Sequence, residues 1–313
     1  MPSLNRRLRQ FRKRFAHWLF RHGQRFKVDV LPRHFYSSVP DLRELRRWPS
    51  WRKPMSMVGV NGADVEQQVA SARELCAAAA ARERLTTLNI HQFAIGENGE
   101  VGYGPIEAEF LYGFVATRRP RRVVQVGAGV STAIILRSAA DAGYQVEVTC
   151  VDPYPSNYLR RVGAAGKVRL LAERAQDVDL SVLTDVGQDG MLFVDSTHTV
   201  KAGSEVNRII LEALPRLPKG AMVHFHDIFF PYDYQPSIFD EPFFSEESAL
   251  LHAYLANNER YRIRVSMSML HYAAVQEMQA LFPRYHPRRH EDGVQVKGET
   301  GHFPSATYLE VIA

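Results

Sequence analysis

The feature that most limits how this chain of 313 residues can fold is the alternation of strand-like and helix-like segments that begins at Arg121. Short apolar runs that end in turns alternate with longer segments whose apolar residues recur at helical spacing. We expect strands over residues 123–126, 146–151, 168–171, 191–194, 221–225 and 261–267. The helices between them include residues 131–142, 175–186 and 246–257. This alternation predicts an α/β domain with a parallel sheet that helices cover on both faces.

The first 53 residues hold most of the positive charge of the chain. They contain 15 Lys and Arg against 3 Asp and Glu, a net of +12, whereas the remaining residues carry a net of −7. Residues 4–26 have the pattern of a basic amphipathic helix. Its apolar stripe comprises Leu4, Leu8, Phe11, Phe15, Trp18 and Leu19. We expect the stripe to pack on its own domain or on a second copy of the chain; contact with a membrane surface is the weaker alternative, and no nucleic-acid-binding motif accompanies the charge.

The part of the chain before residue 90 lacks the alternating pattern. We expect residues 1–90 to form a basic, mainly helical extension that includes one helix over residues 63–85, and residues 91–313 to form the main domain. Residues 89–104 hold several glycines and are expected to be a loop. A helix over residues 273–281 and a polar loop are expected before the end of the chain.

Neither a membrane span nor a disulfide is indicated by the sequence. No run of about 18 apolar residues occurs, and the charged N-terminus does not fit a secretory signal. The two cysteines, Cys76 and Cys150, lie far apart. Cys150 stands in an apolar strand-like run, where a buried free thiol is expected. These observations favour a reducing, cytoplasmic location.

A glycine-rich turn, VGAGVST at residues 126–132, follows the first expected strand. Gly127 and Gly129 lack a Cβ, so the backbone can turn tightly there and approach a ligand closely. Ser131 and Thr132 stand where the next helix begins, and their hydroxyls can cap it. A dinucleotide fingerprint requires glycine at position 132, so the threonine argues against a nicotinamide cofactor.

Asp152 ends the second expected strand. A carboxylate at this place can accept hydrogen bonds from both ribose hydroxyls of a nucleoside that lies across the edge of the sheet. The alternative is an aspartate that serves only a turn. The strand, glycine turn, helix and acidic strand end together favour a nucleoside-type cofactor.

Two further segments place acids and imidazoles after apolar strands. Asp195 and His198 follow residues 191–194, and His226 and Asp227 leave residues 221–225. Because parallel strands end on one edge of a sheet, we expect these four side chains to converge. They could remove a proton from a hydroxyl or bind a divalent metal ion. A polar cluster that only stabilises the edge is the alternative. His224 lies inside the strand and is expected to be a packed, hydrogen-bonded histidine.

From about residue 105 to residue 236 the chain resembles the class I S-adenosylmethionine-dependent methyltransferases, and more narrowly the methyltransferase family 24 subgroup. The segments that carry the resemblance are VVQVGAGVST, VDP, LFVDSTH and HFHDIFFP. The resemblance implies a doubly wound, Rossmann-like sheet of seven strands. Its last strand, expected over residues 307–312, would run antiparallel to the others.

The resemblance also implies S-adenosyl-L-methionine as the cofactor. Its methionine part would lie on the glycine turn and its ribose on Asp152, with Asp177 or Gln176 near the adenine. The residues expected to bind it are Gly127, Ala128, Gly129, Ser131, Thr132, Asp152, Asp177 and Asp195. In related metal-dependent O-methyltransferases, acids at the positions of Asp195 and Asp227 bind a divalent ion. Gln125 departs from the pattern, because such proteins often have an acid there.

These observations predict a methyltransferase that acts on a hydroxyl of a small molecule or of a sugar-like acceptor. His198, His226 and Asp195 are the expected catalytic residues, and Asp195 and Asp227, with the two histidines, are the expected metal ligands. The alternatives are a metal-dependent hydrolase or hydroxylase on the same fold, an NAD-dependent oxidoreductase, and a non-catalytic binding protein. The acceptor is not indicated by the sequence.

Overall fold

The computed structural model describes residues 4–33 and 35–313, without the side chains of residues 4–7 and 9. The predicted stripe residue Leu4 therefore lies outside the described side chains. Contacts divide the chain into two compact units, Met1–Trp51 and Arg52–Ala313.

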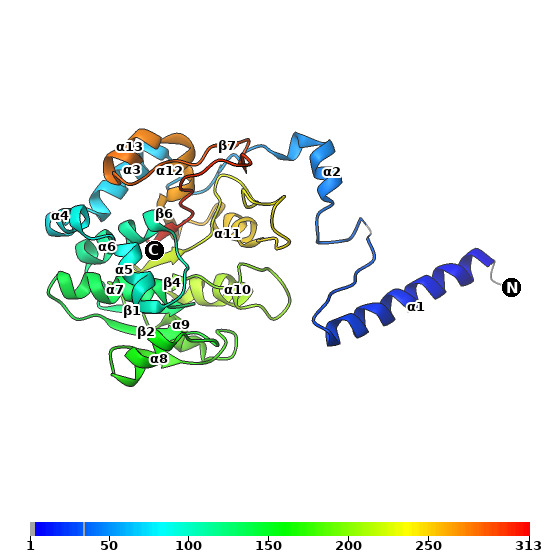
Figure 1. The fold of residues 1–313 in the computed structure, drawn as a ribbon, viewed down its shortest axis with the longest axis horizontal. Helices are drawn as coiled ribbons and strands as arrows, with labels where there is room; N and C mark the ends of the chain where they lie inside the picture. The colour runs from blue at the N-terminus through cyan, green and yellow to red at the C-terminus, as the bar shows by residue number, and fades with distance from the viewer. Residues whose placement is uncertain (1–3, 34) are drawn as a thin grey trace. The chain divides into compact units, whose positions relative to one another are not determined.

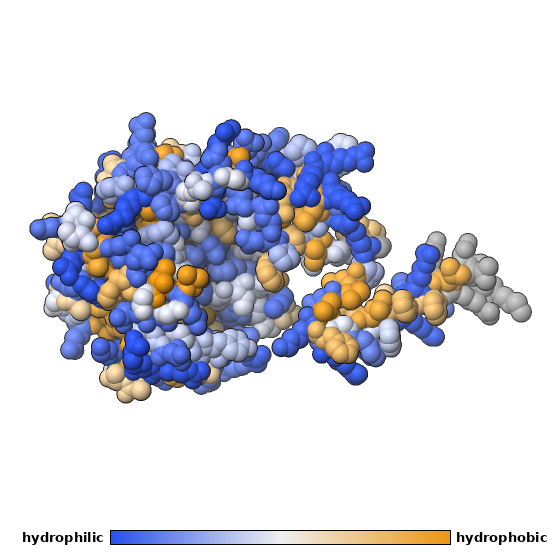
Figure 2. Space-filling model, in the orientation of Figure 1, coloured by the Kyte–Doolittle hydropathy of each residue, from blue (hydrophilic) through white to orange (hydrophobic). Residues whose placement is uncertain are grey.

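The first unit holds the basic helix that the sequence predicts. Its elements are α1 (Leu4–Arg25), α2 (Leu42–Arg47) and the short 3₁₀ turn η1 (Pro49–Trp51). Leu8, Phe11, Phe15 and Trp18 are between 49% and 69% exposed, and Figure 2 shows apolar residues on the surface of this unit. The rings of Phe11 and Phe15 stack at 6.3 Å, and those of Phe15 and Trp18 at 6.0 Å. Packing of this stripe on a second copy of the chain stays a prediction.

The second unit is built on a seven-stranded sheet with the strand order β3-β2-β1-β4-β5-β9-β6. Figure 1 labels β1, β2, β4 and β6 of this sheet. The strands are β1 (Arg122–Val126), β2 (Glu147–Val151), β3 (Arg169–Leu171), β4 (Met191–Val194), β5 (Met222–Phe225), β6 (Tyr261–Ser266) and β9 (Thr307–Val311). Strands β1 to β5 pair in parallel, and β9 pairs antiparallel with both β5 and β6. The predicted seven-stranded, mostly parallel sheet with an antiparallel last strand is confirmed.

Helices cover both faces of this sheet. The elements outside the sheet are α3 (Val65–Leu75), α4 (Ala79–Thr87), α5 (Ile90–Asn98), α6 (Pro105–Arg118), α7 (Val130–Asp141), α8 (Asn157–Ala164), α9 (Leu180–Thr184), α10 (Glu205–Arg208), the π turn η2 (Ile209–Ala213), the 3₁₀ turn η3 (Leu214–Arg216), α11 (Glu247–Leu255), α12 (Met267–Ala273), α13 (Val275–Leu281) and the two-stranded hairpin β7 (His290–Glu291) and β8 (Val294–Gln295). Successive strand residues face opposite layers: Val123 belongs to one buried cluster and Val124 to the other. The doubly wound architecture follows from this alternation.

Three local predictions were wrong. Residues 89–104 are not all loop, because the Asn89 side chain accepts a hydrogen bond from the Gln92 N–H and caps α5, which ends at Gly99 in the left-handed conformation. The single helix expected over residues 63–85 is two helices, since α3 ends before Cys76 and α4 begins at Ala79. The helix expected over residues 175–186 is only the five-residue α9, which Asp179 caps.

The first unit, as defined by contacts, ends at residue 51. The boundary that the sequence pattern predicts at residue 90 lies at the start of α5. Helices α3 and α4 belong to the second unit. The limits of the catalytic domain at residues 91–313 stay a prediction. Both cysteines are buried and free, and no helix in the described part of the chain is long and apolar enough to cross a membrane.

A buried amide joins α3 to the sheet. Gln68 is 1% exposed; its Nε2 donates to the Gly62 carbonyl at 2.9 Å, and its Oε1 accepts from the Ser266 N–H at 2.9 Å. This side chain therefore satisfies one backbone group in the turn before α3 and one at the end of β6. Buried backbone groups without partners are costly, so α3 is part of the structural core of the second unit.

We expect Gln68→Leu to lower the free energy of unfolding by about 2–4 kcal/mol, because it leaves the Gly62 carbonyl and the Ser266 N–H without partners. Gln67→Leu makes the same chemical change at an exposed position and should cost less than about 0.5 kcal/mol. Urea unfolding of the full chain measures both. Equal stabilities of the two variants would contradict the role assigned to Gln68.

Candidate active site

The glycine turn between β1 and α7 comes very close to the end of β4. Gly127 has φ +77°, and a Cβ built on it would lie 1.7 Å from the carbonyl oxygen of Asp195. The Asp195 N–H donates to the Val126 carbonyl at 2.8 Å. Only glycine fits at this position, because an added Cβ would overlap backbone that the sheet holds in place. The turn and Asp195 are thereby brought together at one edge of the sheet.

A buried amide under the turn holds both hydroxyls of the predicted cap. Gln125 is fully buried; its Nε2 donates to Ser131 Oγ at 2.9 Å, and its Oε1 accepts from Thr132 Oγ1 at 2.8 Å. Thr132 Oγ1 in turn accepts from the Gly129 N–H at 3.1 Å. The departure from an acid at position 125 is thus compatible with the turn, since a neutral amide both donates and accepts hydrogen bonds at this buried position.

Asp152, at the end of β2, lies against the same turn. Its Oδ2 accepts from the Ala128 N–H at 3.2 Å, and its Oδ1 accepts from the Tyr154 N–H at 2.8 Å. Each carboxylate oxygen has a further lone pair, and the residue is half-buried. The carboxylate is therefore fixed beside the glycine turn with acceptor capacity left for a ligand.

The helix that was predicted as a loop adds a residue to this region. Asn98, at the end of α5, accepts from Ser156 Oγ at 2.7 Å, and a Cβ on Gly129 would lie 3.1 Å from Asn98 Oδ1. Gly129 (φ +144°) therefore also needs to be glycine. The sequence signal that could have identified Asn98 is the Asn-Gly pair at a helix end.

Asp177 is placed differently from the other predicted cofactor residues. It is exposed, and its Oδ2 accepts from Arg174 Nε at 2.6 Å. It lies in the irregular segment after β3 rather than on a helix. In the part of the chain that the structure describes, it forms no hydrogen bond or ion pair with the glycine turn or Asp152. Its contact with adenine stays a prediction.

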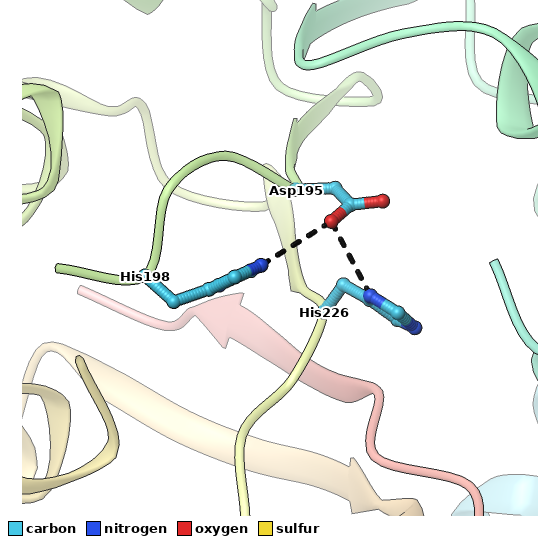
Figure 3. Close-up of side chains that lie close together, drawn as sticks. All are labelled: Asp195, His198 and His226. Atoms are coloured by element: carbon cyan, nitrogen blue, oxygen red, sulfur yellow. Dashed lines mark ion pairs between the residues drawn. The ribbon is translucent and has the colours of Figure 1, made fainter. Parts of the chain in front are cut away.

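Asp195, His198, His226 and Asp227 converge at the ends of β4 and β5, as Figure 3 shows for the first three. His198 Nε2 lies 3.5 Å from Asp195 Oδ1 and 3.7 Å from Asp227 Oδ2. His226 Nδ1 lies 3.3 Å from Asp195 Oδ1 and 3.7 Å from Asp227 Oδ2. One nitrogen of each imidazole thus faces both carboxylates. We call these four residues the rim cluster.

Two members of the rim cluster have strained backbone. His198 has φ +57° and Asp227 has φ +52°, in the left-handed region that most side chains avoid. Such strain persists only where the surrounding structure imposes it, and it is concentrated at functional sites. Here it turns both side chains toward Asp195 and His226.

A second layer of polar residues orients the rim cluster. Glu247, fully buried at the start of α11, lies 2.8 Å from His198 Nδ1. Ser305 Oγ donates to Asp227 Oδ1 at 2.8 Å, and Glu205 accepts from the Thr197 N–H and hydroxyl. Sequence reasoning missed Glu247, Ser305 and Glu205, because nothing in their local patterns indicates the distant partner.

His224 and Tyr103 are buried beside the rim cluster and contact each other. His224 is fully buried, as the sequence predicted, and its Nε2 lies 3.0 Å from the Tyr103 hydroxyl. The ring of Tyr103 also packs on His226 with a centroid distance of 4.9 Å. Tyr103 precedes α6, so the segment before the sheet contributes to the site.

The charges of the rim cluster strongly perturb one another. Burial opposes the charged imidazole of His226, but the carboxylates of Asp227 and Asp195 outweigh it and raise its pKa to about 10. Burial likewise opposes the charge of His198, yet its hydrogen bonds to Asp195 and Glu247 raise its pKa well above the usual range. For Asp195, burial is outweighed by His226 and His198, which lower its pKa. The carboxylates of the rim cluster and Glu247 therefore favour a positive charge between them.

The donor set fits a divalent metal ion. Asp195, His198 and His226 each offer one ligand atom, and these three atoms all lie within 4.8 Å of one another. Asp227 Oδ2 is a further oxygen, 3.7 Å from one nitrogen of each histidine. Imidazole nitrogens together with carboxylate oxygens are ligands that divalent metal ions bind in proteins. His226 Nδ1 is buried without a hydrogen-bond partner, which is expected of a nitrogen whose lone pair has a metal as its partner. Glu247 behind His198 is the outer carboxylate that metal-binding histidines commonly have.

A cavity of about 490 Å³ opens beside the rim cluster. His198, Asp227 and Glu107 line it near the cluster, together with Ser305. The cavity is also lined by Phe229, Glu241, Arg288, His290, Gln295, His302 and Phe303. A cavity of this size accommodates a small molecule.

Replacing Gly127 by alanine should destabilise the protein severely, by more than about 3 kcal/mol, because the new Cβ overlaps the Asp195 carbonyl. Gly143 is the matched control: it also has positive φ, but nothing lies within 4 Å of an added Cβ. Gly143→Ala should cost only about 1–2 kcal/mol of backbone strain. Thermal unfolding of both variants tests this, and equal losses would show that the contact with Asp195 does not matter.

Comparison with known proteins identifies a similar family. Residues 124–228 match the family model Methyltransf_24, described as a methyltransferase domain. An uncharacterized protein of Archaeoglobus fulgidus is 26% identical over 156 residues, which span 48% of this chain and 70% of that protein.

Among solved structures, cofactor-bound Rv0187 from MTB is 17% identical, with a TM-score of 0.44 over 71% of this chain and 89% of that chain. The SAH-bound Podospora anserina methyltransferase PaMTH1 is 13% identical, with a TM-score of 0.42 over 72% of this chain and 88% of that chain. The match to the family model covers the last three residues of β1, all of β2 to β5, the glycine turn and the whole rim cluster. Residues 124–228 are thus similar to the methyltransferase domain that this family model describes.

Proposed function

We propose that the protein transfers a methyl group from S-adenosyl-L-methionine to a hydroxyl oxygen of a small-molecule acceptor, with a divalent metal ion held by the rim cluster. The observation that supports this most is the close approach of Gly127 to Asp195, which places the expected cofactor turn against the expected metal ligands. In such a site, methyl transfer depends mainly on holding the two reactants in line.

The cofactor would supply a methyl group on a sulfonium centre. Gly127, Ala128 and Gly129 would hold its methionine part, and Asp152 would accept its ribose hydroxyls. Ser131 and Thr132 would support the turn rather than bind the cofactor through their side chains. Gln125 binds both hydroxyls and so fixes the start of α7. Asp195, next to the turn, is the residue that both halves of the site share.

The metal ion would lower the pKa of the acceptor hydroxyl. Asp195, Asp227, His198 and His226 would hold it, and two imidazoles in the set favour zinc, manganese or iron over magnesium. His198 Nε2 and His226 Nδ1 both face the carboxylates of Asp195 and Asp227. This arrangement supports the ligand role of His198 and His226 over the role of general base.

The remaining residues orient these groups. Glu247 fixes the ring of His198, and Ser305 fixes the carboxylate of Asp227. Asp227, with 40% of its side chain exposed, and His198 line the cavity in which the acceptor would lie. The acceptor hydroxyl would therefore approach the rim cluster from the side of the cavity.

The cofactor site is tested by titration calorimetry of the full chain with S-adenosylhomocysteine. We expect Asp152→Asn to weaken binding at least ten-fold, about 1.4 kcal/mol, since the amide removes a charged acceptor. Asp179→Asn is the control, because Asp179 is exposed and caps α9, where asparagine serves equally well. Asp177→Asn decides whether that side chain contacts the cofactor. A wild-type protein that does not bind S-adenosylhomocysteine would contradict the proposed function.

The metal site is tested by equilibrium dialysis against zinc, manganese or magnesium, followed by elemental analysis. We expect about one zinc or manganese ion per chain, a rise in the melting temperature on metal addition and its reversal by a chelator. Asp195→Asn should abolish tight binding, whereas Asp189→Asn, in an exposed turn, should not change it. Binding that is equally weak in the wild type and Asp195→Asn would refute the metal site.

A further inference from the structure

Resting on the proposed function, we propose that the acceptor is a hydroxylated ring compound that carries an acidic group, and that Arg288 binds this group. Arg288 lines the same cavity as His198 and Asp227. The acceptor would thus be held at two points, its hydroxyl at the rim cluster and its anion at the guanidinium. Three independent features of the cavity support this.

The first feature is the uncompensated charge of Arg288. Its Nη1 donates to Gln295 Oε1 at 3.1 Å, and its Nε is buried without a partner. Among the residues that the structure describes, no carboxylate forms an ion pair with it. The neighbouring Arg289, in contrast, is exposed and pairs with Glu291 at 3.1 Å. A half-buried guanidinium without an anion is costly, and a planar carboxylate or phosphate is its preferred partner.

The orientation of Arg288 is set by a neutral group. Gln295 accepts from Arg288 through Oε1 and donates through Nε2 to Asp240 Oδ2 at 2.8 Å. The amide therefore positions the guanidinium without neutralising it. An acid at position 295 would have filled the place of a ligand anion, so this arrangement is typical of a preformed anion site.

The second feature is His290, whose Nε2 is buried without a partner. Its other nitrogen, Nδ1, lies 3.0 Å from both His271 Nε2 and the Arg288 carbonyl oxygen. Burial lowers the pKa of His290 to about 4, so the ring is neutral near pH 7. A fixed, neutral imidazole beside Arg288 offers a polar atom to a ligand without adding a competing charge.

The third feature is a wall of flat rings. Phe229 and Phe303 stack at 6.4 Å with an interplanar angle of 23°, and Phe303 lies 4.6 Å from the ring of His290. All three residues line the cavity. Flat apolar side chains favour a ligand with a ring face over a flexible polar chain.

The spacing of the two anchor points fits a single small molecule. The Arg288 N–H donates to the His302 carbonyl, and Ser305 Oγ donates to Asp227 Oδ1. His302 and Ser305 are three residues apart, so one short segment contacts both Arg288 and Asp227. Both residues line the same cavity of about 490 Å³, which accommodates a small molecule.

The charges in the cavity also set the direction in which the acceptor binds. Glu107, Asp227 and Glu241 line the cavity together with Arg288. Glu107 is 3% exposed and accepts from the Ser305 N–H at 2.9 Å, close to the rim cluster. Among the described residues that line the cavity, Arg288 is the one arginine or lysine. The acidic group of the acceptor is therefore directed to Arg288 and the hydroxyl to the rim cluster.

Matched pairs of probes test this inference by binding, without requiring turnover. One pair is 3-hydroxybenzoate and 3-hydroxybenzamide; the other is glucose 6-phosphate and glucose. In the first pair an amide replaces the carboxylate, and in the second pair a hydroxyl replaces the phosphate ester. A preference for the anion in the first pair indicates a site for a carboxylate, and one in the second pair indicates a site for a phosphate. Affinities are measured by ligand-observed NMR on the full chain with S-adenosylhomocysteine and zinc present, for the wild type, Arg288→Gln, Arg288→Lys and Arg289→Gln.

In at least one pair, the wild type should bind the anionic member at least ten-fold more tightly than the neutral one. Arg288→Gln should abolish this preference, Arg288→Lys should keep part of it, and Arg289→Gln should keep all of it. Unchanged affinity for S-adenosylhomocysteine shows that each variant is folded. Equal binding of both members, failure of all four probes to bind, or a preference that survives in Arg288→Gln overturns the inference. Loss of S-adenosylhomocysteine binding by the wild type would instead contradict the proposed function.

Discussion

The contact between the backbone of Gly127 and the carbonyl of Asp195 is the constraint on which the rest of the site depends. It exists because β1 and β4 are neighbours in the sheet and end at the same edge. With any side chain at position 127, the turn would have to move away from β4. The glycine turn would then no longer lie against the rim cluster, and the two halves of the site would separate.

Electrostatics explains why the rim cluster is built as it is. Asp195 and Asp227 face one nitrogen of each imidazole, Nε2 of His198 and Nδ1 of His226, and Glu247 adds a buried carboxylate behind His198. Such a concentration of acids favours compensating positive charge, and it raises the pKa values of His198 and His226 accordingly. The strained backbones of His198 and Asp227 are in keeping with a site whose geometry is imposed by its function.

Much of the fold and half of the site could be predicted because the signals are local. The seven strands, the glycine turn and the acids after β2, β4 and β5 are each visible within a few residues. The errors arose where a local signal was ambiguous. Several glycines suggested a loop over residues 89–104, but one of them ends a helix, and the short α9 lies in a longer segment that has the pattern of a helix.

The sequence by itself determined the parallel sheet, the edge on which its polar residues gather and the chemical types available there, because strand and turn preferences act between near neighbours. Only the tertiary structure decided which distant side chains complete the site. Glu247, Ser305 and Arg288 lie 20 or more residues after β5 in the chain, and their sequence neighbours carry no mark of their partners. Their positions depend on how β9 and the segments around it return to the edge of the sheet, which is settled by the packing of the whole domain.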